Sequence, residues 1–248
     1  MRFDELRANW DGLGRTDPYW AILAYPERLG GNWAGDEAEF FATGRRAVDA
    51  VVETLDRLVL RPAPLHRALD FGCGAGRLTQ ALTPYAEHVD GVDIAASMIE
   101  LARSHNQFPN HVTYHLNEAP DLALFSDASF DLIVSIIVLQ HIPNPLKRRY
   151  LAEFVRILRP GGVAVFTVPS HGDLSLEGIV RRVPNSWQNA YRRRKYGYKD
   201  VMEFHPLRRG KVESTIGTAG GEILHVEREY SAGGPFISYL YVVGKPTQ

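Results

Sequence analysis

Short apolar runs alternate with longer amphipathic stretches between residues 67 and 168. A short continuous apolar run predicts a strand covered on both faces, and apolar residues spaced three or four apart predict a helix. Strands that alternate with helices indicate βαβ units, a mostly parallel sheet and right-handed crossovers. The predicted strands are 67–71, 88–93, 112–116, 130–136 and 163–168, and the predicted helices are 78–82, 95–104 and 146–158, with Pro160-Gly161-Gly162 ending the last helix.

The segments on either side follow other patterns. Residues 1–35 are rich in aromatic residues and glycine, which favours an irregular arm that packs on the rest of the chain. Residues 36–60 repeat valine and leucine at helical spacing, with Asp36 as a candidate N-cap. Beyond the fifth strand we predict an insert at 170–210 and a helix at 208–219. Two further strands, at 222–229 and 236–243, are predicted to close the sheet as an antiparallel pair.

Composition and charge restrict the function classes. The chain has 248 residues, of which 45% are hydrophobic and 23% charged, so it can form a packed core. A formal net charge of −1 gives no overall attraction to nucleic acid or to an anionic membrane. Cys73 is the one cysteine, which excludes an intrachain disulfide and fits a reducing compartment. Because Asp4, Glu5 and Asp11 stand where a signal peptide would be apolar, and the apolar run 132–139 is too short for a bilayer, we expect a cytoplasmic protein.

A glycine-rich loop carries the clearest chemical signal. It reads DFGCGAGR over 70–77, follows a predicted strand and opens a helix, so backbone N–H groups can approach a ligand closely. Its spacing, with Arg77 after the third glycine, does not meet the G-x-G-x-x-G pattern of dinucleotide sites. Asp93 ends the second strand, 21 residues after Gly72, where a carboxylate can accept hydrogen bonds from both ribose hydroxyls. An adenosine linked to an amino acid fits this pattern better than a dinucleotide.

Four blocks of the chain resemble the class I S-adenosylmethionine-dependent methyltransferases of the small-molecule type. The resemblance covers about 66–170, with weaker support towards the end of the chain. It implies an α/β fold with a Rossmann-like, doubly wound, mostly parallel sheet and a C-terminal antiparallel strand pair. We expect an N-terminal helical arm over 1–65 and the S-adenosylmethionine-binding core over 66–248, with a lid or acceptor insert at 170–210. The blocks are ALDFGCGAGRLTQAL (68–82), GVDIAASMIELAR (91–103), SFDLIVSIIVLQHI (129–142) and RILRPGG (156–162).

The resemblance also implies a role for individual residues in binding S-adenosylmethionine, with no metal. Where the family often has Asp facing the adenine amine, this chain has Asn117 followed by Glu118, and the loop to Phe125 is about two residues longer. The implied set is Asp70, Gly72, Cys73, Gly74 and Gly76 for the methionine end, Asp93 for the ribose, Ile94 and Met98 for the adenine, Asn117 or Glu118 for the adenine amine, and the backbone at Ser135 and Ile136 for the methionine amine.

Several side chains are candidates for the chemistry itself. His141, just beyond the fourth strand, is a candidate general base or acceptor-orienting group; His171 and His205 are further candidates, and each could instead be a loop histidine bonded to backbone. Tyr19 and Trp20 could stabilise a sulfonium cation through their faces, or could simply pack as an apolar plug. Cys73 stands at a helix N-terminus, which should lower the pKa of its thiol, although nothing nearby suggests a nucleophile.

The sequence leaves several functions open. The first hypothesis is methyl transfer to the oxygen of a small molecule, in a monomer or homodimer; the alternatives are a macromolecular acceptor, such as protein or RNA, and a non-catalytic relic of the fold. The basic run 192–195, flanked by Tyr191 and Tyr196, could follow a phosphate backbone or form a solvated lid helix. We expect no nucleic acid and no membrane partner, because the net charge is near neutral and 135–138 lacks the Asn/Asp-Pro-Pro-Tyr block of base-modifying enzymes.

Overall fold

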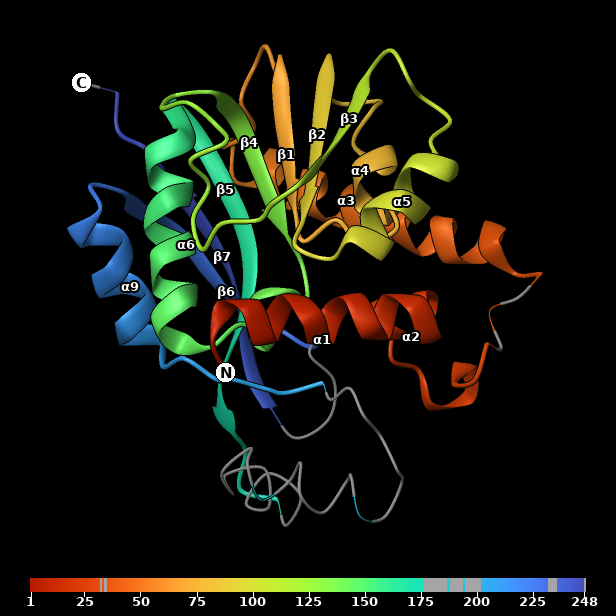
Figure 1. Ribbon diagram of the computed structural model, residues 1–248. Helices are drawn as coiled ribbons and strands as arrows, with labels where there is room; N and C mark the ends of the chain where they lie inside the picture. Colours follow the sequence, from red (N-terminus) through yellow and green to blue (C-terminus); the bar gives the residue numbers. More distant parts are fainter. Residues whose placement is uncertain are drawn as a thin grey trace.

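Seven strands form a single sheet in the order β3-β2-β1-β4-β5-β7-β6 (Figure 1). The computed structural model describes residues 1–31, 33, 35–175, 187, 194, 202–231 and 236–247, so most of the predicted lid insert lies outside the described residues. The first five strands are parallel, whereas β7 pairs antiparallel with both β5 and β6. The strands are β1 (Arg67–Phe71), β2 (His88–Asp93), β3 (Val112–Leu116), β4 (Phe130–Ser135), β5 (Leu158–Gly172), β6 (Glu222–Glu229) and β7 (Phe236–Gly244).

Helices cover both faces of the sheet. Figure 1 shows α3, α4 and α5 on one side and α6 and α9 on the other, which confirms the predicted doubly wound, mostly parallel architecture. Each face has its own buried apolar cluster, one built around Val48, Leu82 and Val134 and the other around Ile133, Phe154 and Phe166. The helices are α1 (Phe3–Thr16), α2 (Pro18–Ile22), α3 (Glu37–Arg57), α4 (Arg77–Ala81), α5 (Ala96–Ser104), α6 (Asn144–Ile157) and α9 (Arg209–Thr218), with short 3-10 turns at Pro26–Arg28 and Leu139–His141.

The N-terminal segment is helical, and the expectation of an irregular arm over its first half is wrong. Gly14, which lowers helix propensity, lies inside α1 because a side chain there would meet Ser97 of α5. The helix is fixed by tertiary contacts: Asp11 accepts a hydrogen bond from the Ser97 N–H at 2.8 Å, and its backbone carbonyl accepts one from the Ser97 hydroxyl at 3.0 Å. Composition alone does not reveal such contacts.

The fifth strand is longer than predicted. β5 begins at Leu158, directly after α6, and passes through Pro160-Gly161-Gly162 instead of starting beyond it. The irregular step stays attached to the sheet because the Gly161 N–H donates to the Lys245 carbonyl at 2.7 Å, and a register shift between Phe130 and Leu132 absorbs the difference. The turn residues therefore mark a bulge inside the strand.

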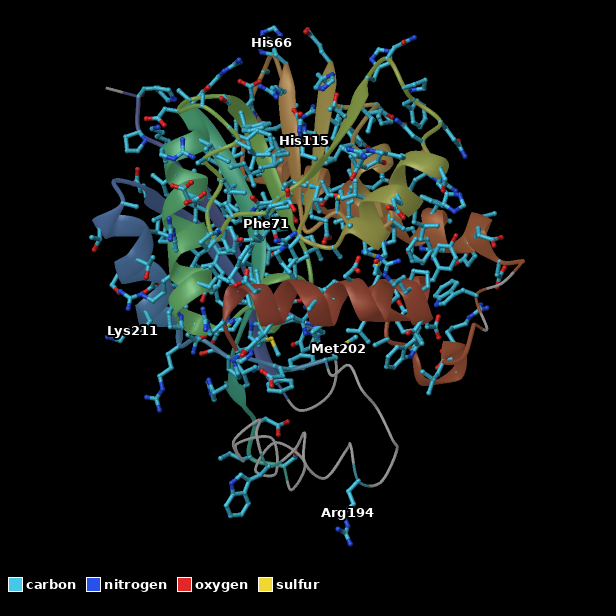
Figure 2. The ribbon with its side chains drawn as sticks, in the orientation of Figure 1. His66, Phe71, His115, Arg194, Met202 and Lys211 are labelled. Atoms are coloured by element: carbon cyan, nitrogen blue, oxygen red, sulfur yellow. The ribbon has the colours of Figure 1, made fainter. Side chains whose placement is uncertain are left out.

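The first helix lies across the carboxyl ends of the parallel strands. Figure 2 places His66, which precedes β1, at the far end of the sheet and Phe71, which ends β1, next to α1. In open α/β sheets this is the edge at which ligands bind. No helix in the described part of the chain is both long and apolar enough to cross a membrane.

Candidate active site

The loop after β1 can be built only from glycine at three positions. Gly72, Gly74 and Gly76 have φ values of +76°, +50° and +83°, in the left-handed region that side chains disfavour. A Cβ on Gly72 would lie 2.3 Å from Val138 Cγ1, and a Cβ on Gly76 would lie 2.2 Å from the Tyr114 hydroxyl. At these three positions the loop therefore presents backbone without side chains at the edge of the sheet.

Asp93, at the end of β2, ties this loop to the sheet. Its Oδ2 accepts a hydrogen bond from the Gly74 N–H at 2.9 Å, and its Oδ1 accepts one from the Ala95 N–H at 2.9 Å. Burial raises the pKa of the carboxyl above its ordinary value. Each carboxylate oxygen can accept more than one hydrogen bond, so Asp93 can hold the loop and still accept from a ligand hydroxyl.

Asp70 is a second buried carboxylate at the same edge. It is 1% exposed, and its Oδ2 accepts a hydrogen bond from the Thr79 hydroxyl at 2.7 Å. Burial, with a smaller contribution from nearby Asp93, raises the pKa of Asp70 to about 6. The prediction of a lowered pKa for Cys73 is wrong, because burial first, and then the charges of Asp93 and Asp70, raise the pKa of its thiol well above the ordinary value.

One pocket opens at the carboxyl ends of β1, β2 and β4, between the sheet edge and α1. It holds about 900 Å³ of empty space when the open solvent at its mouth is included. Ten of the residues predicted from the sequence line it: Asp70, Gly72, Cys73, Gly74, Asp93, Ile94, Met98, Asn117, Ile136 and His141.

His141 contacts both walls of this pocket. Its ring lies edge-on to Trp10 of α1 at a centroid distance of 5.1 Å and to Phe204 at 4.8 Å. Its Nδ1 lies 2.9 Å from the Glu203 carbonyl oxygen, which can only accept, so Nδ1 carries the proton. Nε2, 3.1 Å from the Gln140 side-chain nitrogen, is then the unprotonated nitrogen. Burial lowers the pKa of His141 to about 4, so the ring is neutral at pH 7.

The other two candidate histidines do not line the pocket. His171 is exposed on β5, with its Nδ1 3.0 Å from the Ser170 hydroxyl. His205 is half-buried, and its Nε2 lies 3.0 Å from a Glu203 carboxylate oxygen. Burial lowers the pKa of His205. Of the three histidines, the structure brings His141 alone to the pocket wall.

Five further candidates lie beside the pocket but do not line it. Tyr19 donates to or accepts from His105 at 2.8 Å, and with Trp20 it packs on the buried cluster around Trp33 and Phe40. These two aromatic residues lie where the plug interpretation put them. The exposed Glu118 pairs with Arg7 of α1 at 2.8 Å, the Ser135 hydroxyl donates to the Phe71 carbonyl at 3.1 Å, and Gly76 lies against Tyr114.

The backbone beyond β4 is strained at the pocket. Ile137 has a φ of +59°, a conformation that β-branched residues avoid, and its N–H donates to the Thr167 hydroxyl at 2.9 Å. Such strain is concentrated at ligand sites, because the surrounding structure must hold it in place. Ile136, Ile137 and Val138 all face the pocket.

Sequence reasoning missed the wall that faces the glycine loop. Leu6 and Trp10 of α1 and Ala21 and Ile22 of α2 line the pocket, as does Tyr150 of α6. Trp10 was noted only as part of an aromatic segment. Apolar residues repeating at helical spacing over 3–16 were the available signal, and the two glycines in that stretch obscured it.

Asn117 and Arg77 are polar pocket residues with different environments. Asn117 is buried, and its side-chain amide donates to the Asp121 carbonyl at 2.8 Å, which fixes its orientation. Arg77, which follows the third glycine of the loop, also lines the pocket. Among the described residues no group of three or more histidine, cysteine or acidic side chains could hold a metal ion.

The structure is thus a doubly wound α/β fold with a pocket at the carboxyl ends of its parallel strands, where such sheets bind ligands. Residues 69–166 match the sequence model of the methyltransferase domain family. This region of the chain is therefore similar to a methyltransferase domain, and the sheet that it forms has a Rossmann-like, doubly wound topology.

Curated relatives match part of the chain. A protein named ubiquinone biosynthesis O-methyltransferase from Xanthomonas campestris pv. campestris is 34% identical over 110 residues, which are 44% of this chain and 45% of the relative. A protein of the same name from Aromatoleum aromaticum is 31% identical over 102 residues, 41% of this chain and 43% of the relative. The matched region thus spans less than half the length of these relatives.

Solved structures share the fold over more of the chain. Magnesium protoporphyrin IX methyltransferase from Synechocystis PCC 6803, with bound SAH, superposes with a TM-score of 0.59 at 17% identity, covering 82% of this chain and 84% of that one. A SAM-dependent methyltransferase from Methanosarcina mazei gives a TM-score of 0.58 at 20% identity, over 76% and 96% of the two chains. At such identities the likeness shows the fold alone.

Proposed function

We propose that this protein transfers a methyl group from S-adenosylmethionine to an oxygen of a small-molecule acceptor. The observation that carries the proposal is the meeting, in one pocket, of the bare glycine loop, the carboxylate of Asp93 and the neutral ring of His141. The methyltransferase domain match and the relatives named O-methyltransferase support the same reaction class. The choice of oxygen as the acceptor atom rests on the names of these relatives, and the role of a histidine rests on the position of His141 in the pocket.

The pocket residues fit the cofactor. A Cβ at Gly72 or Gly74 would crowd the loop, since it would meet Val138 or Ile22 at less than a normal contact distance. Asp93 can accept hydrogen bonds from the ribose hydroxyls. The carboxyl of Asp70, with a pKa of about 6, is mostly ionised at pH 7 and can accept from an ammonium group. Apolar Ile94 and Met98 can flank the adenine. We assign the adenine amine to Asn117 and the methionine amine to the strained backbone near Ile136.

When bound, S-adenosylmethionine supplies a methyl group on a sulfonium that is already a good leaving group, so the protein need only align the acceptor and handle its proton. Leu6 and Trp10 of α1, with Ile142, provide an apolar wall, which excludes water and favours an acceptor that is itself largely apolar. We propose that the N-terminal arm, residues 1–65, acts as a cover on the core, residues 66–248.

The single lone pair of His141 Nε2 accepts from the Gln140 amide in the structure, and we propose that an acceptor hydroxyl replaces this donor and is then oriented by Nε2. Its Nδ1 proton is held by the Glu203 carbonyl, so the ring cannot rotate freely and Nε2 keeps one direction. The lowered pKa makes the ring a weak base, and it can take up the acceptor proton only as that proton becomes more acidic during transfer. Orientation is therefore its first role, and proton acceptance follows as the new carbon–oxygen bond forms.

Calorimetric titration with S-adenosylmethionine and SAH, with NAD as a control, tests the proposal. We expect micromolar binding of the two adenosyl ligands and none of NAD. Transfer of radioactive methyl from labelled S-adenosylmethionine to a panel of phenols, amines and tRNA then identifies the acceptor class. Binding of NAD, or transfer only to protein or RNA in a strongly salt-dependent manner, would contradict the proposal.

A further inference from the structure

Residues 203–206, which we call the return segment, lead from the insert to α9 and contact His141 in the pocket wall. The Glu203 carbonyl accepts from His141 Nδ1 at 2.9 Å, and the Phe204 ring packs on the His141 ring at a centroid distance of 4.8 Å. These two contacts can set the direction of Nε2 only if the return segment is itself held in place. The orientation of His141 therefore depends on what fixes these four residues.

Lys147 of α6 holds the return segment, although it does not line the pocket. Its ammonium donates to the His205 carbonyl, and to the Asn144 side-chain oxygen at 3.2 Å. The Asn144 amide in turn donates to the Pro206 carbonyl at 3.1 Å, and the His205 N–H donates to the Gln140 carbonyl at 2.7 Å. Two successive carbonyls of the return segment are thus bonded to side chains at the beginning of α6.

A lysine is costly at this position. The side chain is 0% exposed, and burial lowers the pKa of its ammonium to about 7. Both oxygens that accept from Lys147 belong to neutral groups, so they offset only part of the cost of removing a charge from water. An apolar side chain would fill the same space without that cost. The two hydrogen bonds and the charge are therefore what the lysine adds.

The charge of Lys147 also acts on the ring of His141. Burial lowers the pKa of His141, and the charges of His205 and Lys147 lower it further, whereas the bond to the Glu203 carbonyl raises it. The Glu203 carboxylate is the acidic group of this cluster, 3.0 Å from His205 Nε2. A neutral imidazole has one protonated nitrogen, so a proton held on Nδ1 leaves Nε2 as the acceptor. Both the charge and the return segment thus favour the form of His141 that can accept from a hydroxyl.

We propose that Lys147 is a positioning residue for His141: it holds the return segment so that the Glu203 carbonyl keeps the ring proton on Nδ1 and the lone pair on Nε2. The inference rests on the proposed function, because this arrangement matters to catalysis only if His141 orients the acceptor. In a purely structural role, Lys147 would only stabilise the packing of α6 against the return segment. Its loss would then lower Tm and leave the tautomer of His141 unchanged.

The tautomer of His141 can be measured without cofactor or acceptor. In protein labelled with ¹⁵N-histidine, long-range ¹H–¹⁵N spectra show which ring nitrogen carries the proton, and the signals missing from His141→Gln assign this ring. We expect the Nδ1–H tautomer in the native chain. For Lys147→Met we expect the ratio of the Nδ1–H to the Nε2–H form to fall roughly five- to tenfold, the usual effect of losing one hydrogen bond. Lys211→Met, at an exposed position on α9 (Figure 2), is the matched control and should keep the native ratio.

Turnover gives a second measurement once an acceptor is known. Lys147→Met should lower kcat roughly tenfold, in proportion to the lost tautomer. The dissociation constant of SAH should stay within about twofold of native, because the glycine loop and Asp93 are distant from the substitution and share no partner with it.

Each other outcome has a distinct meaning. A native tautomer ratio in folded Lys147→Met, or the Nε2–H tautomer in the native chain, would overturn the inference whatever the protein binds. A native chain that does not bind SAH would instead overturn the proposed function and leave the tautomer result standing. If Lys147→Met does not fold, Asn144→Ala removes the bond to Pro206 and one acceptor of the ammonium, and the ratio should fall at least about twofold. An unchanged ratio in folded Asn144→Ala would contradict the proposal.

Discussion

Asp93 serves two purposes at the level of a single side chain. It accepts from the Gly74 and Ala95 N–H groups, and so fixes the loop, while its remaining lone pairs face the pocket. We expect Asp93→Ala to weaken binding of SAH by about 1–3 kcal/mol, the cost of losing a charged acceptor. Calorimetry checks this, with 5′-methylthioadenosine as a second ligand that shares the ribose and should lose equally. Near-normal binding would mean that the ribose lies elsewhere.

Asp70 should make cofactor affinity depend on pH. Its pKa in the free protein is about 6, raised mainly by burial, and only the ionised carboxylate attracts an ammonium group. As the pH falls through 6, protonation removes the charge, so affinity for SAH should fall about tenfold between pH 7 and pH 5. Titrations at several pH values measure this slope. Asp70→Asn should bind more weakly at pH 7 and show a flatter profile; an unchanged slope in that variant would assign the titration to another group.

A substitution at His141 should lower catalysis without changing cofactor binding. Its replacement in His141→Ala removes the Nε2 acceptor but leaves the glycine loop and Asp93 in place, so we expect kcat to fall about 100-fold with the SAH dissociation constant within about twofold of native. His66→Ala is a suitable control, because His66 lies at the opposite end of the sheet (Figure 2). If the first variant keeps full turnover once the acceptor is known, no base acts at His141, and His205 or His171 becomes the better candidate.

Single residues differ in how far the sequence alone determines them. Asp93 and the glycines at 72 and 74 were predictable, because their roles depend on local backbone geometry and on a fixed distance along the chain. The ionisation of Cys73 was not, since burial by the rest of the fold outweighs the helix terminus.

At the scale of elements, α1 forms one wall of the pocket. It is joined to α5 through Asp11 and Ser97, to the loop after β3 through Arg7 and Glu118, and to His141 through Trp10. Figure 1 shows it crossing the edge of the sheet where β1 and β4 end. The position of this one helix therefore couples cofactor binding to the acceptor side of the pocket.

Gly14 provides a test of that coupling. A Cβ at this position would lie 2.4 Å from the Ser97 hydroxyl and 3.3 Å from Met98 Cγ, so Gly14→Val should push α1 away from α5. We expect SAH binding to weaken by about 1–2 kcal/mol through overpacking. Gly217→Ala in α9, where a Cβ meets nothing within 4 Å, should leave binding unchanged and slightly raise Tm. A lower Tm together with native affinity would show that the position of α1 does not affect ligand binding.

The parallel strands were easier to predict than the elements around them. The bounds of β1, β2 and β3 agree with the predicted runs, including those of β3, which lies at an edge of the sheet and is partly exposed. β5 extended past its prediction, since the glycines at 161 and 162 are accommodated by a bond to Lys245 that only the folded chain supplies. α1 and α2 were hidden for the same reason: their stability comes from contacts distant in sequence.

For the whole molecule, the class of fold was the most reliable prediction. Alternating strand and helix patterns restrict the sheet to few topologies, and right-handed crossovers select among them, so the doubly wound arrangement and the antiparallel end were foreseeable. The acceptor could not be predicted from the sequence. The side of the pocket proposed to receive it is formed by α1, the turn before α6 and the segment around Phe204, and these segments have no fixed sequence pattern.

The crossing of α1 over the pocket has a consequence for the order of folding. Residues 3–16 are made before their partners, because the partners of Arg7 and Asp11 come 111 and 86 residues later along the chain. Contacts so distant along the chain close late, after the sheet that offers them has formed, and elements that join late also detach first in the native state. We therefore expect α1 to attach after the sheet and to be among the first elements that detach, which would open the pocket that it covers.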